Sequence, residues 1–203
     1  MMITLEELVP LEKTAIPEVS KSLEKGDIVQ LVEWLEEKDD KIRYNSLLLL
    51  QSRSTTSPDV YPFWDIFKDK LKSENSYQRS IGLMLMADNT KWDVENKLDL
   101  AINDYLMLID DEKPITVRQC IQALLKIIPY KKQLCPVMAE KLTAFDISKV
   151  RETMQKPVLL DILNVLIEIR KYHKSDDVES YILKALSGGI IDGKTKRMFE
   201  KLL

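Results

Sequence analysis

The chain has 203 residues with 30 basic and 33 acidic side chains, a net charge of −3 and a pI near 5.4. This length can bury a sizeable core, and 45% hydrophobic with 31% charged residues is too apolar for a disordered chain. Nucleic-acid-binding proteins usually show a high pI or a basic face, so the acidic pI argues against that class without excluding a local basic patch. Only five glycines occur, which favours helices joined by short turns.

The two cysteines and the lack of long apolar segments indicate where in the cell the protein is expected. Cys120 and Cys135 form no CxxC pair and lie among apolar residues, which predicts reduced thiols in a cytoplasmic protein. Near the start, Glu6, Glu7 and Glu12 interrupt any signal-peptide core. No apolar run approaches the roughly 20 residues that span a bilayer, so we expect no membrane partner.

Apolar residues recur at helical spacing along the whole chain. Amphipathic stripes cover residues 28–35, 60–71 and 94–109, whereas more thoroughly apolar segments cover 47–50, 81–86, 121–128 and 159–169. A helix that is apolar on several sides is buried on several sides. The alternation therefore predicts layers of helical hairpins, with about 70% helix and no sheet, well above the usual helix content.

Turn and capping residues divide these helices. Gly26-Asp27 indicates a helix stop followed by an N-cap, and Ser57-Pro58-Asp59 indicates a turn. Asn75-Ser76 and Lys113-Pro114 are typical of breaks before new helices. The string Ser187-Gly188-Gly189 predicts the end of a helix that contains Val178 to Leu186.

The most informative feature is a repeat at the start of each central helix. Similar four-residue strings occupy 40–43, 76–79, 115–118 and 156–159, and they end in Arg43, Arg79, Arg118 and Leu159. The last residues of these strings are 36, 39 and 41 positions apart. Three positions after each string lies a small or apolar residue, and six positions after it lies an apolar one. Spacing near 40 with two helices per unit is typical of a helical solenoid.

These observations predict an all-α fold, a HEAT/armadillo-like α-solenoid of stacked helical hairpins in a single domain, 1–203. The predicted repeat units cover residues 27–54, 60–89, 93–129 and 133–172, followed by C-terminal capping helices in 176–203.

The opening at Val117-Arg118 looks like the second helix of a HEAT repeat. Residues 27–170 resemble a group of small bacterial HEAT-like proteins through Asn75-Ser-Tyr-Gln-Arg79, Lys91-Trp92-Asp93 and Asp111-Glu-Lys-Pro-Ile-Thr-Val-Arg-Gln-Cys120. Some members are labelled "SufBD protein", which would imply iron–sulfur cluster assembly. That label belongs to proteins with a β-helical core, and this chain shows no strand pattern, so the activity is not carried over.

No residue pattern argues for catalysis, a metal or a cofactor. His173 is the only histidine and lies in a charged helix end, where a solvated side chain is expected. Residues 188–195 match the phosphate-binding loop pattern G-x-x-x-x-G-K-[ST] literally. Such a loop needs a preceding strand within a parallel sheet, whereas a helix is predicted here, so we interpret the match as a helix stop before Asp192 caps a last helix. We therefore expect no enzyme.

The candidate binding residues are Arg43, Arg79 and Arg118, with Trp92. Repeat stacking would align the three arginines along one edge, where each either pairs with a nearby carboxylate or carbonyl or recognises an acidic or phosphate group of a partner. Asp40, Asp111 and Glu112 are candidate internal partners by proximity in sequence.

Three further residues have structural or binding interpretations. Trp92 lies at a predicted hairpin turn, where it either fastens that turn or presents an aromatic anchor to a partner. Trp64 and Cys120 fall on apolar stripes and are predicted to be core residues.

Two functional hypotheses follow. The first is a non-catalytic scaffold or protein-interaction module with an unidentified protein partner, because solenoids expose long surfaces that vary without disturbing the core. The alternative is a nucleic-acid-binding HEAT-like protein, comparable to the HEAT-like DNA glycosylases, that uses the arginine row; the acidic pI opposes it. The sequence does not predict the oligomeric state.

Overall fold

The computed structural model describes residues 3–203, of which 74% are helical, and no strand occurs among these residues. The predicted all-α class is therefore confirmed. The chain divides into two compact units, Met1–Ala101 and Ile102–Leu203, and the border falls within helix α7 (Lys97–Leu106). No helix in the described part of the chain is long and apolar enough to cross a bilayer.

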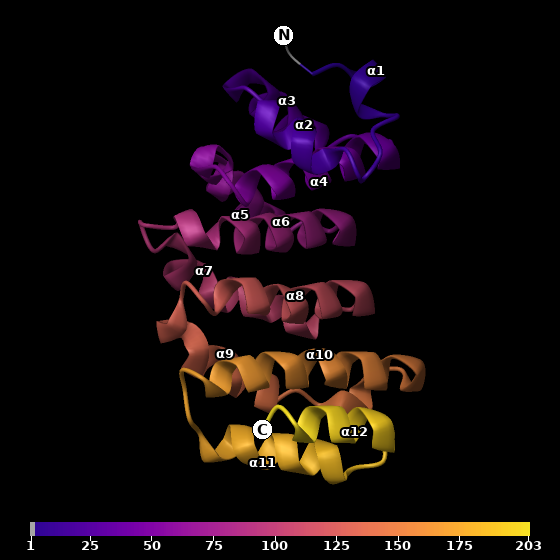
Figure 1. Ribbon diagram of the computed structural model, residues 1–203, viewed down its shortest axis with the longest axis vertical. Coiled ribbons are helices and arrows are strands. Elements are labelled where there is room, and N and C mark those ends of the chain that lie inside the picture. The colour runs from indigo at the N-terminus through magenta and orange to yellow at the C-terminus, as the bar shows by residue number, and fades with distance from the viewer. Residues whose placement is uncertain (1–2) are drawn as a thin grey trace. The chain divides into compact units, whose positions relative to one another are not determined.

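The N-terminal unit is built around two central helices, α4 and α6, that pack on each other (Figure 1). Helices α1, α2 and α3 cover α4, and α5 packs along α6. The elements are α1 (Leu5–Leu8), α2 (Ile16–Ser22), α3 (Lys25–Trp34), α4 (Asp40–Ser54), η1 (Pro58–Phe63), α5 (Trp64–Lys70), α6 (Ser76–Asn89) and η2 (Thr90–Trp92).

The C-terminal unit repeats this arrangement around α8 and α10, which also pack on each other (Figure 1). Segment η3 packs on α8, whereas α9 and α11 pack on α10. The elements are η3 (Met107–Asp110), α8 (Pro114–Ile127), η4 (Lys132–Leu134), α9 (Cys135–Thr143), η5 (Ile147–Lys149), α10 (Glu152–Arg170), α11 (Asp176–Ser187) and α12 (Gly193–Glu200).

The central helices α4, α6, α8 and α10 contain the four strings that define the repeat. Side chains on the buried faces of these helices form the core. The residues six positions after each string, Leu49, Leu85, Leu124 and Val165, have no exposed surface. Burying such a side chain stabilises the fold by about 1.5–3 kcal/mol. The predicted register of the repeat is thus matched by the burial of all four positions.

Gly82 permits the closest helix contact in the N-terminal unit. A β-carbon at this position would lie 2.5 Å from the carbonyl oxygen of Phe67 and 2.9 Å from Cβ of Lys70. Because van der Waals contact needs more than 3 Å, only glycine allows α6 to approach α5 this closely. The small residue predicted at this position therefore sets the spacing of the hairpin.

Several predicted helix boundaries are confirmed. Asn75 caps α6 by accepting a hydrogen bond from the backbone N–H of Tyr77, and Pro114 is the first residue of α8. Helix α11 ends at Ser187, directly before the glycine pair. Each of these boundaries is set by a residue at the helix end itself, such as a capping side chain, a proline or a glycine. Such residues can be recognised in the sequence.

The predicted stop at Gly26 is wrong. Helix α3 already begins at Lys25, and Gly26 lies within its first turn. The carboxylate of Asp27 accepts hydrogen bonds from the backbone N–H groups of Glu24 at 2.7 Å and Ile3 at 2.6 Å. Asp27 therefore caps the helix from its third position, the reciprocal arrangement of a capping box, and the helix starts earlier than the glycine indicated.

The stripe predicted to begin at Val94 is also shorter than expected. Val94 is 84% exposed and lies in the turn before α7. The carboxylate of Asp93 accepts hydrogen bonds from the N–H groups of Lys97 at 2.8 Å and Leu98 at 3.0 Å, which fixes the start of the helix after Val94. The predicted repeat units begin at residue 27, whereas the structure also has α1 and α2 before that residue.

Candidate functional site

Arg43 lies in the first turn of α4 and is held by three groups of the N-terminal unit. Its guanidinium donates to the carbonyl oxygen of Glu37 at 2.9 Å and forms an ion pair with Asp40, the partner proposed from sequence. It also lies 5.2 Å from the centre of the Tyr77 ring, on the adjacent helix α6. The Arg43 side chain is only 13% exposed, so most of it is used within the protein.

Arg79 occupies the equivalent position in α6 of the same unit. Its guanidinium donates to the carbonyl oxygens of Ser73 at 2.8 Å and Glu74 at 2.9 Å. These carbonyls end the preceding turn, so Arg79 fastens the loop between α5 and α6. Its role in the described structure is to satisfy backbone acceptors that would otherwise need water.

Arg118, in α8 of the C-terminal unit, forms a two-point ion pair across the hairpins. Its Nε lies 2.6 Å and its Nη2 lies 3.3 Å from the carboxylate oxygens of Asp161, in α10. Gln122 donates to the same carboxylate at 2.9 Å. The hydrogen bond to Asp161 raises the pKa of Arg118. The partner of Arg118 is thus Asp161. It lies two residues after Leu159, the residue that ends the fourth string where the other three strings end in arginine.

Each arginine therefore has hydrogen-bond partners, and in every case these partners belong to the same unit as the arginine. Arg43 and Arg79 belong to the N-terminal unit, at the amino ends of two adjacent helices, whereas Arg118 belongs to the C-terminal unit. Engaged guanidinium groups have fewer donors left for a ligand. This geometry favours the structural interpretation of the row over the recognition of phosphate.

Trp92 lies at the opposite end of α6 from Arg79. Its indole N–H donates to the carbonyl oxygen of Ser54 at 2.8 Å, and Lys91 lies 4.5 Å from its ring centre. Because Ser54 is the last residue of α4, Trp92 joins the carboxyl ends of two central helices. The contact favours the interpretation of Trp92 as a fastening residue.

The residues predicted to be core are buried. Trp64 is 1% exposed and Cys120 is fully buried, with its thiol 3.5 Å from the carbonyl oxygen of Tyr105. Burial raises the pKa of the Cys120 and Cys135 thiols. Among the described residues, no three His, Cys, Asp or Glu side chains form a group suited to a metal ion.

The segment that matches a phosphate-binding loop connects two helices, α11 and α12. The carboxylate of Asp192 accepts hydrogen bonds from the backbone N–H groups of Lys194 at 3.1 Å and Thr195 at 2.9 Å. An aspartate thus occupies the amides that would hold a phosphate in a nucleotide site. The predicted helix stop and Asp192 cap are confirmed, and the absence of nucleotide affinity stays a prediction.

One surface around the candidate arginines was missed in the sequence. Tyr44 and Tyr77 are 44% and 65% exposed at the amino ends of α4 and α6. Lys13 lies 5.2 Å from the centre of the Tyr44 ring, just as Arg43 lies on Tyr77. We call Arg43, Tyr44, Tyr77 and Arg79 the tyrosine–arginine surface. Tyr77 lies within the second repeat string, but its exposure could not be inferred from the apolar stripe.

Comparisons with protein-family models, with curated proteins and with solved structures found no match for this chain. The resemblance to small bacterial HEAT-like proteins therefore stays a prediction, and the site must be interpreted from its own geometry.

Proposed function

We propose that this chain is a non-catalytic helical-repeat scaffold, a HEAT/armadillo-like solenoid, that binds another protein. The spacing of the strings supports the solenoid, as does the packing of consecutive central helices within each unit. Three strings lie at the starts of α4, α6 and α8, whereas the fourth lies four residues inside α10, which begins at Glu152 and so starts earlier than predicted. Two buried cysteines without a disulfide agree with a cytoplasmic location.

The exposed pair Tyr44 and Tyr77 is the observation that carries the proposal. Large aromatic side chains are normally buried, yet these two project from adjacent helices beside Lys13 and Arg43. Tyrosine is among the residues most often responsible for binding energy at protein interfaces, because its ring combines apolar area with a polar hydroxyl group. The cation above each ring limits its rotation, which lowers the entropy lost on binding.

The surroundings of this surface define the chemistry of the partner. Residues 1–101 hold 13 basic and 19 acidic side chains, a net charge of −6. The exposed carboxylates of Asp39, Asp40 and Glu74 lie in the turns and first residues of α4 and α6, next to the two tyrosines. The surface therefore fits a protein segment that carries basic and apolar side chains.

The test compares proteins captured from the native host by the immobilised chain and by two variants. The double variant Tyr44→Ala/Tyr77→Ala removes the exposed rings, and Tyr130→Ala removes a similarly exposed ring from the C-terminal unit. We expect at least one protein to be retained by the wild type and by Tyr130→Ala but to fall more than about tenfold with the double variant. Equal capture of every protein by all three forms would reject the proposed surface.

A further inference from the structure

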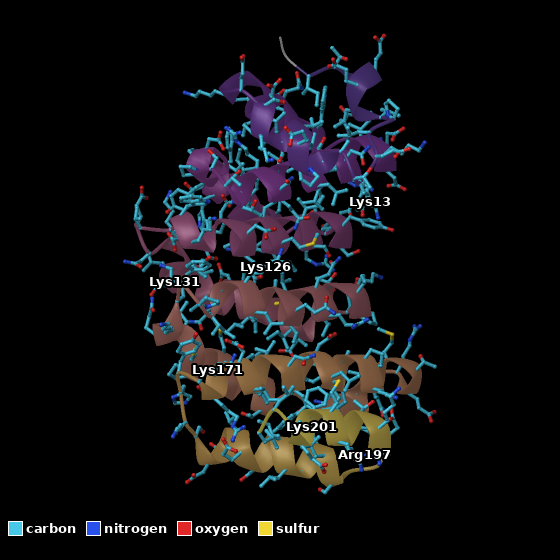
Figure 2. All side chains as sticks on the ribbon, viewed as in Figure 1. Lys13, Lys126, Lys131, Lys171, Arg197 and Lys201 are labelled. Atoms are coloured by element: carbon cyan, nitrogen blue, oxygen red, sulfur yellow. The ribbon has the colours of Figure 1, made fainter. Side chains whose placement is uncertain are left out.

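A second exposed cluster lies at the carboxyl ends of α8 and α10. Tyr130 and Tyr172 are 55% and 42% exposed, and Lys132 lies 4.7 Å from the centre of the Tyr172 ring. Lys171 and Lys174 flank Tyr172 and are also exposed. We call these five residues the lysine–tyrosine surface. It belongs wholly to the C-terminal unit, and Figure 2 labels one of its members, Lys171.

The two tyrosines lie at nearly the same position of consecutive repeats. Tyr130 follows Arg118 by 12 residues, and Tyr172 follows Leu159 by 13. Because α8 and α10 pack on each other, equivalent positions bring the two ends together, as the contact between Lys132 and Tyr172 shows. The ends of the two central helices thus present two exposed tyrosine rings, and Lys132, two residues after Tyr130, lies over the ring of Tyr172.

The charge of the unit is opposite to that of its neighbour in the chain. Residues 102–203 hold 17 basic and 14 acidic side chains, a net charge of +3. Glu168 lies 2.6 Å from Lys171 and engages it. Lys132 and Lys174 form no ion pair with any residue that the structure describes. Two ammonium groups therefore remain available beside the rings.

A cleft of about 650 Å³ continues from this surface. Its lining includes Arg170, Lys171 and Lys174, together with Leu202 and Leu203. Its acidic lining residues are Asp176 and Glu179, and Glu179 already binds Arg170 at 2.5 Å. Lys171 and Lys174 thus belong both to the lysine–tyrosine surface and to the lining of the cleft.

We propose that the lysine–tyrosine surface binds single-stranded nucleic acid. Exposed rings at the ends of adjacent central helices provide stacking platforms for unpaired bases, and the nearby lysines provide positive charge for the phosphates of such a strand. A duplex would satisfy the lysines but not the rings, because its bases are stacked on each other. An acidic protein segment would likewise use only the charges, so the paired rings favour the single strand.

The experiment measures binding of fluorescent oligothymidylate and oligouridylate, about 20 nucleotides long, to the full chain by anisotropy. Tyr130→Ala/Tyr172→Ala should weaken binding by about 5- to 100-fold, the usual effect of losing base stacking. Lys132→Gln/Lys174→Gln should weaken binding and lower the slope of log K against log salt concentration by about 1.4. Leu183→Ala removes an exposed apolar side chain of α11 in the same unit, outside the lysine–tyrosine surface and the cleft, so it is the matched control and should bind like the wild type.

Circular dichroism of each variant checks that the fold is retained, which the exposure of all four side chains leads us to expect. Weaker binding to a duplex of the same length and to polyglutamate would support the proposal. It is rejected if the strands do not bind, if the tyrosine variant binds as tightly as the wild type, or if polyglutamate binds equally well. The last outcome would indicate an acidic protein partner. The result does not depend on the tyrosine–arginine surface, so either proposal can fail alone.

Discussion

Burial of the paired carboxylate distinguishes Arg118 from Arg43. The Asp161 side chain is 10% exposed, whereas the Asp40 side chain that pairs with Arg43 is 86% exposed. Arg118→Ala would leave a nearly buried carboxylate with Gln122 as its remaining side-chain donor, so we expect a loss of about 1–3 kcal/mol in unfolding free energy. Arg43→Ala should cost less, about 0–1 kcal/mol, because its partner Asp40 is exposed and stays hydrated when the arginine is removed. Urea unfolding of both variants checks this order; equal losses would contradict it.

The two cysteines give a second prediction for single residues. Burial raises the pKa of both thiols, so the reactive thiolate is disfavoured in the folded protein at pH 8. We expect Ellman's reagent to label neither Cys120 nor Cys135 until denaturant is added, when both should react. The sign for stability follows: folding is favoured below the unfolded thiol pKa of about 8.5 and is weakened as pH rises above it. Rapid labelling of a native thiol would contradict the buried positions.

At the scale of elements, the close contact between α5 and α6 depends on Gly82, which has no side chain. Ala would normally improve a helix over Gly by about 1 kcal/mol. At Gly82, however, the new Cβ would lie 2.5 Å from a backbone oxygen of Phe67, so we expect Gly82→Ala to cost about 1–3 kcal/mol instead. Gly193→Ala, in α12, is the matched control, since no atom lies within 4 Å of its Cβ position. Thermal melts should separate the two variants; a stable Gly82→Ala would disprove the tight contact.

The helices predicted from sequence are those whose signals are local. Residue type and spacing in the sequence were enough to predict the caps at Asn75 and Asp192 and the burial of Leu124. The early start of α3 was missed because Asp27 acts together with Glu24 and Ile3, a partnership that spacing alone does not reveal.

The candidate site was less predictable for a related reason. The partner of Arg118 is Asp161, 43 positions away, whereas Asp111 and Glu112 were chosen for their proximity in sequence. Which carboxylate an arginine meets depends on which helices are neighbours. The exposure of Tyr77 likewise depends on packing against other elements, so a single repeat string could not indicate it.

At the scale of the whole molecule, the division of charge explains why composition alone was a weak guide to function. A net charge of −3 conceals an N-terminal unit at −6 and a C-terminal unit at +3. The acidic pI opposed nucleic-acid binding for the average chain, yet the proposed strand-binding surface lies only in the basic unit. The protein-binding surface proposed above lies in the acidic unit. Each proposed partner is thus opposite in charge to the unit that would bind it.

The same division predicts how the molecule unfolds. Leu124 is fully buried in α8, so Leu124→Ala should remove about 2–5 kcal/mol of stability from the C-terminal unit. In arrays of repeats, stability is set by each unit and its nearest neighbours, so the loss should not spread evenly. Hydrogen exchange followed by mass spectrometry should show faster exchange in α8 and α10 of the variant, while α4 and α6 keep their protection. Leu49→Ala, at the equivalent position of α4, should give the reverse pattern. If both variants accelerate exchange equally in all four helices, the two units unfold as one cooperative structure and the predicted independence is wrong.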